Sequence, residues 1–259
     1  MLSVMTIFKN PRDAALELQR NPILWPGSDE RSTGYGVMGL PFASGHYLAL
    51  RDMVATSIGP RYRSVWHRAP NRQWTFLADA APEESCARYF ASGSAQTVNA
   101  KIEIRWDGPY SLRVSVPDLL EWRLELASTP VTLLMSALSR RLPAAGGRGE
   151  SFRQMMARVA GPMLRAGRMG MAGTTPNGQR FAAAPWRIWT VSGSSATLRG
   201  VDLGSPLPLL RQAHLGDFWL PQRGLFALAN VAFENFDPAR HHPVPHGSQM
   251  NSVVSQQNN

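Results

Sequence analysis

One stretch of the chain, residues 101–127, constrains the fold more than any other. It contains three short runs of alternating apolar and polar residues, separated by Asp107-Gly108 and Pro117-Asp118. Successive side chains of a strand point to opposite faces of a sheet, so this alternation indicates strands with one buried and one solvated face. Both dipeptides favour tight turns. We therefore predict an antiparallel three-stranded meander.

Further strand-like runs lie on both sides of this meander. They are predicted at 46–52, 62–68 and 74–78 before it, and at 169–175, 179–183, 186–191, 196–201 and 224–234 after it. About ten short strands joined by tight turns favour a closed barrel or sandwich over a βαβ architecture. The predicted fold class is mainly β, an antiparallel β-barrel-like domain.

The hydrophobic period changes at Pro130. Apolar residues recur at helical spacing over about 131–142 and again over 152–163, which predicts an α-helical hairpin inserted near 130–166. Ten arginines and one acidic residue, Glu150, lie between Leu126 and Val201, so this segment carries the whole net charge of +9. A charge confined to one stretch indicates a local electropositive surface.

The remaining segments complete the predicted organisation. Residues 1–22 form an N-terminal arm with a short helix that starts at Asn10-Pro11, 23–236 form one domain, and 237–259 form a disordered polar tail. Residues 25–45 are rich in Gly and Pro and are expected to be loop.

Several classes of protein are disfavoured by what the chain lacks. No run approaches twenty apolar residues, and the N-terminus has no signal-peptide pattern, so we expect a cytoplasmic protein. The single cysteine, Cys86, excludes an internal disulfide and a Cys-based zinc cluster. The only lysines, Lys9 and Lys101, lie in the arm and on a charged face, which disfavours Schiff-base chemistry.

Neither a cofactor nor a metal is predicted. Residues 34–39 match G-x-G-x-x-G, but a dinucleotide site needs a helix directly behind the glycines, and Leu40-Pro41 follows instead. The segment is therefore interpreted as a glycine-rich loop over the barrel mouth. Three histidines in the tail (His241, His242 and His246) are interpreted as adventitious metal binders.

Three residues are candidate acid–base catalysts. His46 and His67 lie in strands beside apolar residues and could point into a barrel, although a hydrogen-bonded structural histidine has the same pattern. Asp217 lies in the aromatic loop 216–224, where it could bind a ligand or cap a turn and pair with Arg223. The predicted ligand-binding residues are Tyr35, Trp66, Trp74, Trp219 and Arg223, with core packing as the alternative for the tryptophans.

Three stretches resemble an uncharacterised family of bacterial proteins. They are Gly34–Phe42, Tyr62–Arg68 and Gly216–Gly224. That resemblance covers most of the chain and implies no activity. The strand-rich halves around a helical insert also resemble the calycin (lipocalin-like) group, which implies a barrel that holds a small apolar ligand.

The leading functional prediction is binding of a small hydrophobic or amphipathic molecule in the barrel, with cofactor-free cyclisation, hydration or isomerisation as the chemistry if the protein is an enzyme. The alternative is a non-catalytic protein at an anionic membrane surface, which it would contact through the helical hairpin. The arginines predicted for that contact are Arg140, Arg141, Arg153, Arg158 and Arg165. A solvated face explains the same charges, and nucleic acid is disfavoured because no reading module is present.

Overall fold

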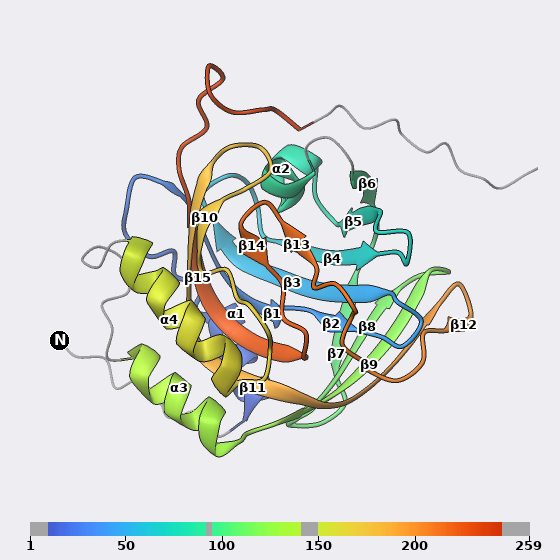
Figure 1. Ribbon diagram of the computed structural model, residues 1–259. Helices are drawn as coiled ribbons and strands as arrows, with labels where there is room; N and C mark the ends of the chain where they lie inside the picture. Colours follow the sequence, from blue (N-terminus) through green and yellow to red (C-terminus); the bar gives the residue numbers. More distant parts are fainter. Residues whose placement is uncertain (1–9, 92–94, 141–149, 245–259) are drawn as a thin grey trace, which may run out of the picture.

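The computed structural model describes residues 10–91, 95–140 and 150–244. One 13-stranded mixed sheet curls through the molecule like a half-barrel (Figure 1). Its strands are β1 Glu30–Val37, β2 Leu40–Pro41, β3 Tyr47–Thr56, β4 Tyr62–Arg68, β5 Trp74–Ala78, β6 Ala95–Asn99, β7 Glu103–Trp106, β8 Ser111–Val116, β9 Leu120–Ala127, β10 Ala172–Thr174, β11 Arg180–Leu198, β12 Val201–Asp202 and β15 Leu225–Phe233. A separate hairpin pairs β13 (His214–Leu215) with β14 (Phe218–Trp219).

The helices are few. They are α1 Pro11–Arg20, α2 Ala87–Phe90, α3 Pro130–Arg140 and α4 Glu150–Met163, with a 3₁₀ turn at Pro82–Glu84. Both helices of the predicted insert are therefore present, and Figure 1 shows them side by side at one side of the sheet. We refer to α3 and α4 together as the Arg-rich hairpin. Within the described residues, every helix is too short or too polar to cross a bilayer.

The strand order is β6-β5-β4-β3-β1-β15-β11-β9-β8-β7. The predicted mainly β class is confirmed, and so is the meander, which forms β7, β8 and β9. The sheet is not purely antiparallel, because β5 and β6 pair in parallel. The segment between them, which contains α2, returns the chain to the same end of the sheet before β6 begins, so the two strands run in one direction.

Two expectations for individual strands were wrong. Most of the three strands predicted within 179–201 forms the single 19-residue strand β11, whose register shifts at Pro185/Arg187 and Val191/Gly193, and Val201 already belongs to β12. Each shift is a bulge that changes which side chains face inward. The alternation is therefore interrupted in the sequence although the strand continues.

The glycine-rich segment is a strand in the middle of the sheet, not the predicted loop or lid. β1 pairs with β15 on one side and with β3 on the other. A Cβ atom on Gly36 would lie 2.0 Å from the backbone oxygen of Leu50, and one on Gly34 would lie 2.3 Å from that of Asp52. The glycines therefore allow a close approach of β1 to β3 rather than a turn.

Both ends of the described chain pack against the sheet. In α1, the Asn10 side chain accepts a hydrogen bond from the Asp13 backbone, as the predicted cap requires, and Ala14 and Ala15 are buried in the core. Within the described part of the predicted tail, His241 and Val244 are buried, whereas their neighbours in the sequence are mostly exposed. Residues 245–259 lie outside the described residues.

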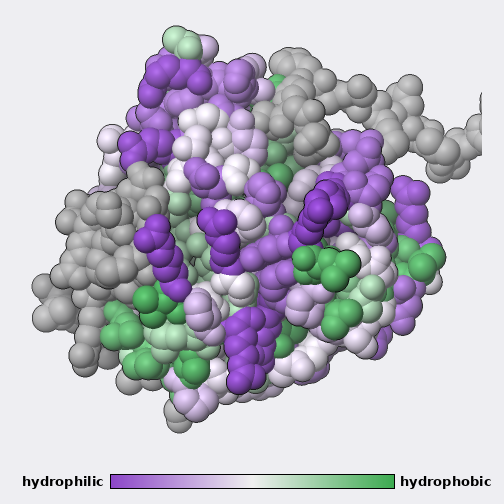
Figure 2. Space-filling view, in the orientation of Figure 1, coloured by the Kyte–Doolittle hydropathy of each residue, from purple (hydrophilic) through white to green (hydrophobic). Residues whose placement is uncertain are grey.

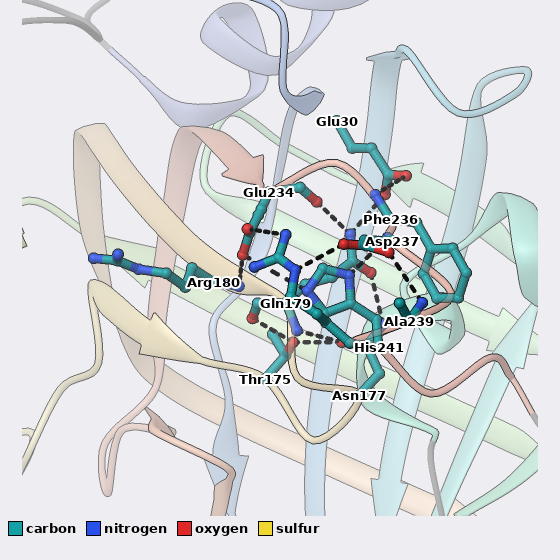
Figure 3. Close-up of polar contacts among 11 residues, drawn as sticks. Glu30, Thr175, Asn177, Gln179, Arg180, Glu234, Phe236, Asp237, Ala239 and His241 are labelled. Carbon is teal, nitrogen blue, oxygen red and sulfur yellow. Dashed lines mark hydrogen bonds and ion pairs between the residues drawn. The ribbon is translucent and has the colours of Figure 1, made fainter.

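A polar network holds the C-terminal segment in place (Figure 3). Gln179 donates hydrogen bonds to the Glu30 carboxylate and to the backbone oxygen of Glu234. The His241 Nδ1 atom accepts from the Asp237 backbone at 2.9 Å. These contacts connect β1, the residue just before β11 and the segment after β15. The network therefore ties the C-terminal segment to the sheet.

The two faces of β3 and β4 belong to different hydrophobic cores. Leu48, Leu50 and Val65 face the core that also contains the meander, whereas Tyr47 and Trp66 face a second, aromatic core. This division places the cavity described next, because the aromatic core is incompletely filled.

Candidate functional site

A cavity enclosing about 70 Å³ lies on the aromatic side of β1, β3, β4 and β15. We refer to it as the inner pocket. Small residues form its floor, among them Gly34, Gly36, Ala183 and Ala229. Its walls are mainly apolar and include Met53, Trp66, Phe90, Phe181 and Phe218. The space exists because small residues on the strands lie opposite large rings that pack against one another, as Phe90 and Phe218 do at 5.3 Å.

Polar residues interrupt this lining, and Arg51, Tyr62 and Cys86 are the ones considered as ligand contacts. The Tyr62 hydroxyl lies 3.1 Å from the Cys86 sulfur, within hydrogen-bond distance. Burial raises the pKa of the Tyr62 hydroxyl well above its usual value, and burial also raises the pKa of the Cys86 thiol. Both groups are therefore protonated at neutral pH and can donate hydrogen bonds.

The Arg51 guanidinium is held from one side. Its Nη1 atom donates to the backbone oxygens of Val37 at 2.6 Å and Leu50 at 2.8 Å, and its Nη2 atom donates to that of Met38 at 3.2 Å. The guanidinium carbon lies 4.7 Å from the centre of the Trp66 ring, a cation–π distance. Burial lowers the Arg51 pKa, but an arginine remains charged.

A larger depression of about 660 Å³ adjoins the inner pocket, and Gly170 and Met171 line both. We refer to it as the outer pocket. Arg168 and Trp219 line this outer pocket, and the guanidinium carbon of Arg168 lies 4.0 Å from the centre of the Trp219 ring. The His214 ring stacks on the same indole, with 4.5 Å between the ring centres. The outer pocket, with its aromatic and cationic side chains, is thus separated from the Arg51 pocket by no more than the Gly170–Met171 segment that lines both.

Asp217 lines the outer pocket, on the β13–β14 hairpin. Its Oδ2 atom accepts a hydrogen bond from the Thr174 backbone at 2.9 Å, so its carboxylate ties this hairpin to β10. This contact gives Asp217 a structural role that differs from both alternatives expected from the sequence. Arg223, the partner proposed for it, is exposed and is not among the described residues that line either pocket.

The structure brings His46 and His67 together. His46 Nδ1 lies 2.8 Å from His67 Nε2, and the two rings stack at 5.0 Å. Burial, with a smaller contribution from His46, lowers the pKa of His67 to about 4, and burial lowers the pKa of His46 as well. His67 alternates with Trp66 along β4, so it faces the opposite side of the sheet. Neither histidine is among the described residues that line the two pockets.

The predicted ligand-binding aromatics are divided between wall and support. Trp66 lines the inner pocket and Trp219 lines the outer one. Tyr35 also borders the inner pocket, but its side chain packs in the other core, where its hydroxyl donates to Asp52. Trp74 is buried and packs edge-on against Trp66, with 6.5 Å between the ring centres. It therefore supports the pocket wall from behind.

Arg51, Tyr62 and Cys86 were not identified from the sequence as pocket residues. Arg51 interrupts the inward-facing positions of β3, between Ala49 and Met53, and a charge at such a position is the signal that could have revealed it. Tyr62 and Cys86 carry no comparable signal, because their burial depends on how α2 packs against β4. Within the described residues, no group of three or more His, Cys, Asp or Glu side chains is arranged to hold a metal ion.

The Arg-rich hairpin exposes apolar side chains. Figure 2 shows a hydrophobic patch at the lower left, over α3 and α4. Its exposed members are Leu133, Leu134, Leu138, Val159 and Met163. Arg158 and Arg165 are exposed on the same hairpin and just after it. Of the other arginines predicted to bind an anionic surface, Arg140 and Arg153 belong to α3 and α4, and Arg141 lies outside the described residues.

Comparison with known proteins yields little. No family model matches the chain, and no curated protein matches it. Among solved structures, an acetoacetate decarboxylase from Legionella pneumophila aligns over 82% of this chain and 86% of its own, with 7% identity and a TM-score of 0.38. This similarity is too low to transfer residues or an activity.

Proposed function

We propose that this protein binds a small, largely apolar molecule in the inner pocket, with the outer pocket as the route of entry. The observation that carries the proposal is a cavity lined by aromatic and small side chains, with a larger open depression directly beside it. Ligand sites are typically concave and apolar, with a few polar groups that fix orientation. Arg51, Tyr62 and Cys86 supply such groups here.

The protonation states of Tyr62 and Cys86 limit which reactions the inner pocket could assist. Tyr62 and Cys86 are hydrogen-bond donors at neutral pH because burial raises both pKa values. Together with Arg51 they suit the polarisation of a ligand oxygen better than the removal of a proton. A cofactor-free isomerisation, hydration or cyclisation in this pocket would rest on these donors. His46, His67 and Asp217 would have to act on a ligand outside the inner pocket.

A neutral apolar fluorophore tests the binding proposal. N-phenyl-1-naphthylamine should bind in about equimolar amount and quench tryptophan emission, since Trp66 forms part of the wall. The variant Ala229→Leu fills the floor and should abolish binding. The control Ala184→Leu changes the neighbouring strand at a residue outside the pocket lining and should bind normally. Absence of binding to the unaltered protein would refute the proposal.

A second function is favoured by the apolar patch on the Arg-rich hairpin. Exposed leucines beside exposed arginines form an amphipathic surface of the kind that lies in the interface of an anionic bilayer. The charge complements anionic lipid, and Arg158 lies at the outer pocket. We propose this peripheral contact as the alternative to an exclusively small-molecule function.

A further inference from the structure

The inner pocket contains a partly buried cation, Arg51, without a neutralising acid among the described residues. The ionisable groups that interact electrostatically with Arg51 are Cys86, Tyr47 and Tyr62. Burial raises the pKa of all three, so none of them carries a negative charge at neutral pH. No described carboxylate forms an ion pair with Arg51. A buried charge normally has a partner, because removing it from water is costly unless an opposite charge replaces the water.

The donors that remain on Arg51 have a specific geometry. The three bonds to backbone oxygens use both Nη1 hydrogens and one Nη2 hydrogen. The Nε–H group and the second Nη2 hydrogen have no hydrogen-bond partner in the described part of the chain. Nε and Nη2 share one edge of the planar guanidinium, and two parallel N–H groups on one edge match the two oxygens of a carboxylate.

The protein has fixed the guanidinium in advance. Backbone oxygens from β1, β3 and the segment after β1 hold one side, and Trp66 supports the face of the plane. A donor pair that is already oriented loses little conformational freedom when an anion binds. Such an arrangement is typical of an anion site and is unnecessary for a purely structural arginine, which would use its remaining donors within the protein.

We propose that Arg51 anchors the carboxylate of an apolar carboxylic acid, whose hydrocarbon part lies along the aromatic wall toward the outer pocket. This inference rests on the proposed function and names its ligand class. Tyr62 and Cys86 line the same pocket, and because one of them donates to the other, the remaining donor hydrogen of the pair is available to the ligand. Arg168, at the outer pocket, draws an anion toward the opening.

Competition with the neutral fluorophore tests the ligand class. Hexanoate and decanoate are titrated against the corresponding alcohols and methyl esters, which have similar apolar parts but no charge. Each acid should displace the fluorophore at a concentration on the order of ten- to a hundredfold lower than its alcohol, since a charge-assisted pair is much stronger than a neutral hydrogen bond. An alkyl sulfate of equal chain length distinguishes a planar carboxylate site from a general anion site.

Two variants separate the charge from the apolar walls. Arg51→Met should retain fluorophore binding and remove the preference for acid over alcohol. Arg51→Lys keeps the charge without the bidentate edge and should show an intermediate preference. If a variant fails to fold, the competition of acids against alcohols on the unaltered protein still tests the carboxylate inference.

Each outcome is decisive. Fluorophore binding with equal competition by acid and alcohol overturns the carboxylate inference and leaves the apolar pocket intact. Equal competition by alkyl sulfate and carboxylate overturns the assignment of the planar group. Absence of fluorophore binding overturns the proposed function and this inference together.

Discussion

Arg51 and Asp52 are consecutive residues of β3 that face opposite sides of the sheet and have opposite electrostatic environments. The Asp52 carboxylate is fully buried and accepts hydrogen bonds from Arg61 and Tyr35, the shortest at 2.7 Å. Arg51 has only backbone oxygens and a ring. On one face of β3 the charge of Asp52 is therefore neutralised by its arginine partner. On the other face the charge of Arg51 has no acidic partner among the described residues.

Asp52→Asn should destabilise the fold by about 3 kcal/mol, because it removes a fully buried charge and leaves the hydrogen bonds from the partly exposed Arg61 and from Tyr35 mismatched. Urea unfolding measures the change. The control Glu103→Gln removes an exposed carboxylate paired with Lys101 and should leave the unfolding midpoint unchanged. An equal effect of both changes would contradict the structural role of Asp52.

Cys86 should react slowly with iodoacetamide at pH 7. The thiolate is the reactive form, and burial raises the thiol pKa and blocks access. Alkylation should be more than about tenfold slower than in urea-unfolded protein, and a bound acid should slow it further, because Cys86 lines the inner pocket. Rapid alkylation that no ligand affects would place the thiol outside the pocket.

His67 should make stability depend on pH. Its pKa in the folded protein is about 4, below the ordinary value of 6.5, mainly because of burial. The folded state thus binds fewer protons than the unfolded state between these values, so its stabilising contribution is complete above pH 6.5 and is lost as pH falls toward 4. The loss is at most about 3 kcal/mol.

The matched variant His67→Gln isolates this contribution from the carboxylates that titrate in the same range. Urea unfolding at pH 7 and pH 4.5 should show a smaller loss for the variant than for the unaltered protein. Parallel stability curves would show that His67 is protonated equally in both states.

Gly36→Ala should strongly destabilise the protein, since the new Cβ would lie 2.0 Å from the Leu50 backbone oxygen and the strands would have to separate. Gly108→Ala is the matched control, because the nearest atom outside its chain neighbours would be the Ser111 hydroxyl oxygen, 3.5 Å from the new Cβ. Thermal unfolding of both variants measures the difference. Similar midpoints would argue against the tight β1–β3 approach.

The Arg-rich hairpin should bring the protein to anionic liposomes at low salt. Replacing Arg140, Arg141, Arg153, Arg158 and Arg165 together by Gln should reduce sedimentation with anionic vesicles, because each arginine near such a surface contributes about 1 kcal/mol at best. The substitution Leu134→Ser should also weaken binding if the exposed patch inserts. Arg105→Gln, outside the hairpin, serves as the control. Equal sedimentation of all variants would end the membrane proposal.

The sequence pattern predicted those helices and strands whose stabilising contacts lie close together in the sequence. The meander follows from alternation and turn residues within 101–127, and α1 follows from Asn10 and Pro11. The hairpin helices follow from the spacing of their apolar residues. In each case the interactions that stabilise the element lie within a few residues or between consecutive strands, so the sequence shows them directly.

The position of β1 and the inner pocket depend on contacts between distant segments. Gly34 and Gly36 have the same appearance in a loop and in a strand, and only their pairing with β3 and β15 distinguishes the two. Arg51 is visible as a charge in an apolar run, but its lack of an acidic partner depends on which side chains reach the same cavity from β4 and α2. The sequence by itself determined the strand-rich class, the meander and the basic helical hairpin. Tertiary structure decided the central strand, the pocket and its unpaired cation, because these arise from packing across the curled sheet.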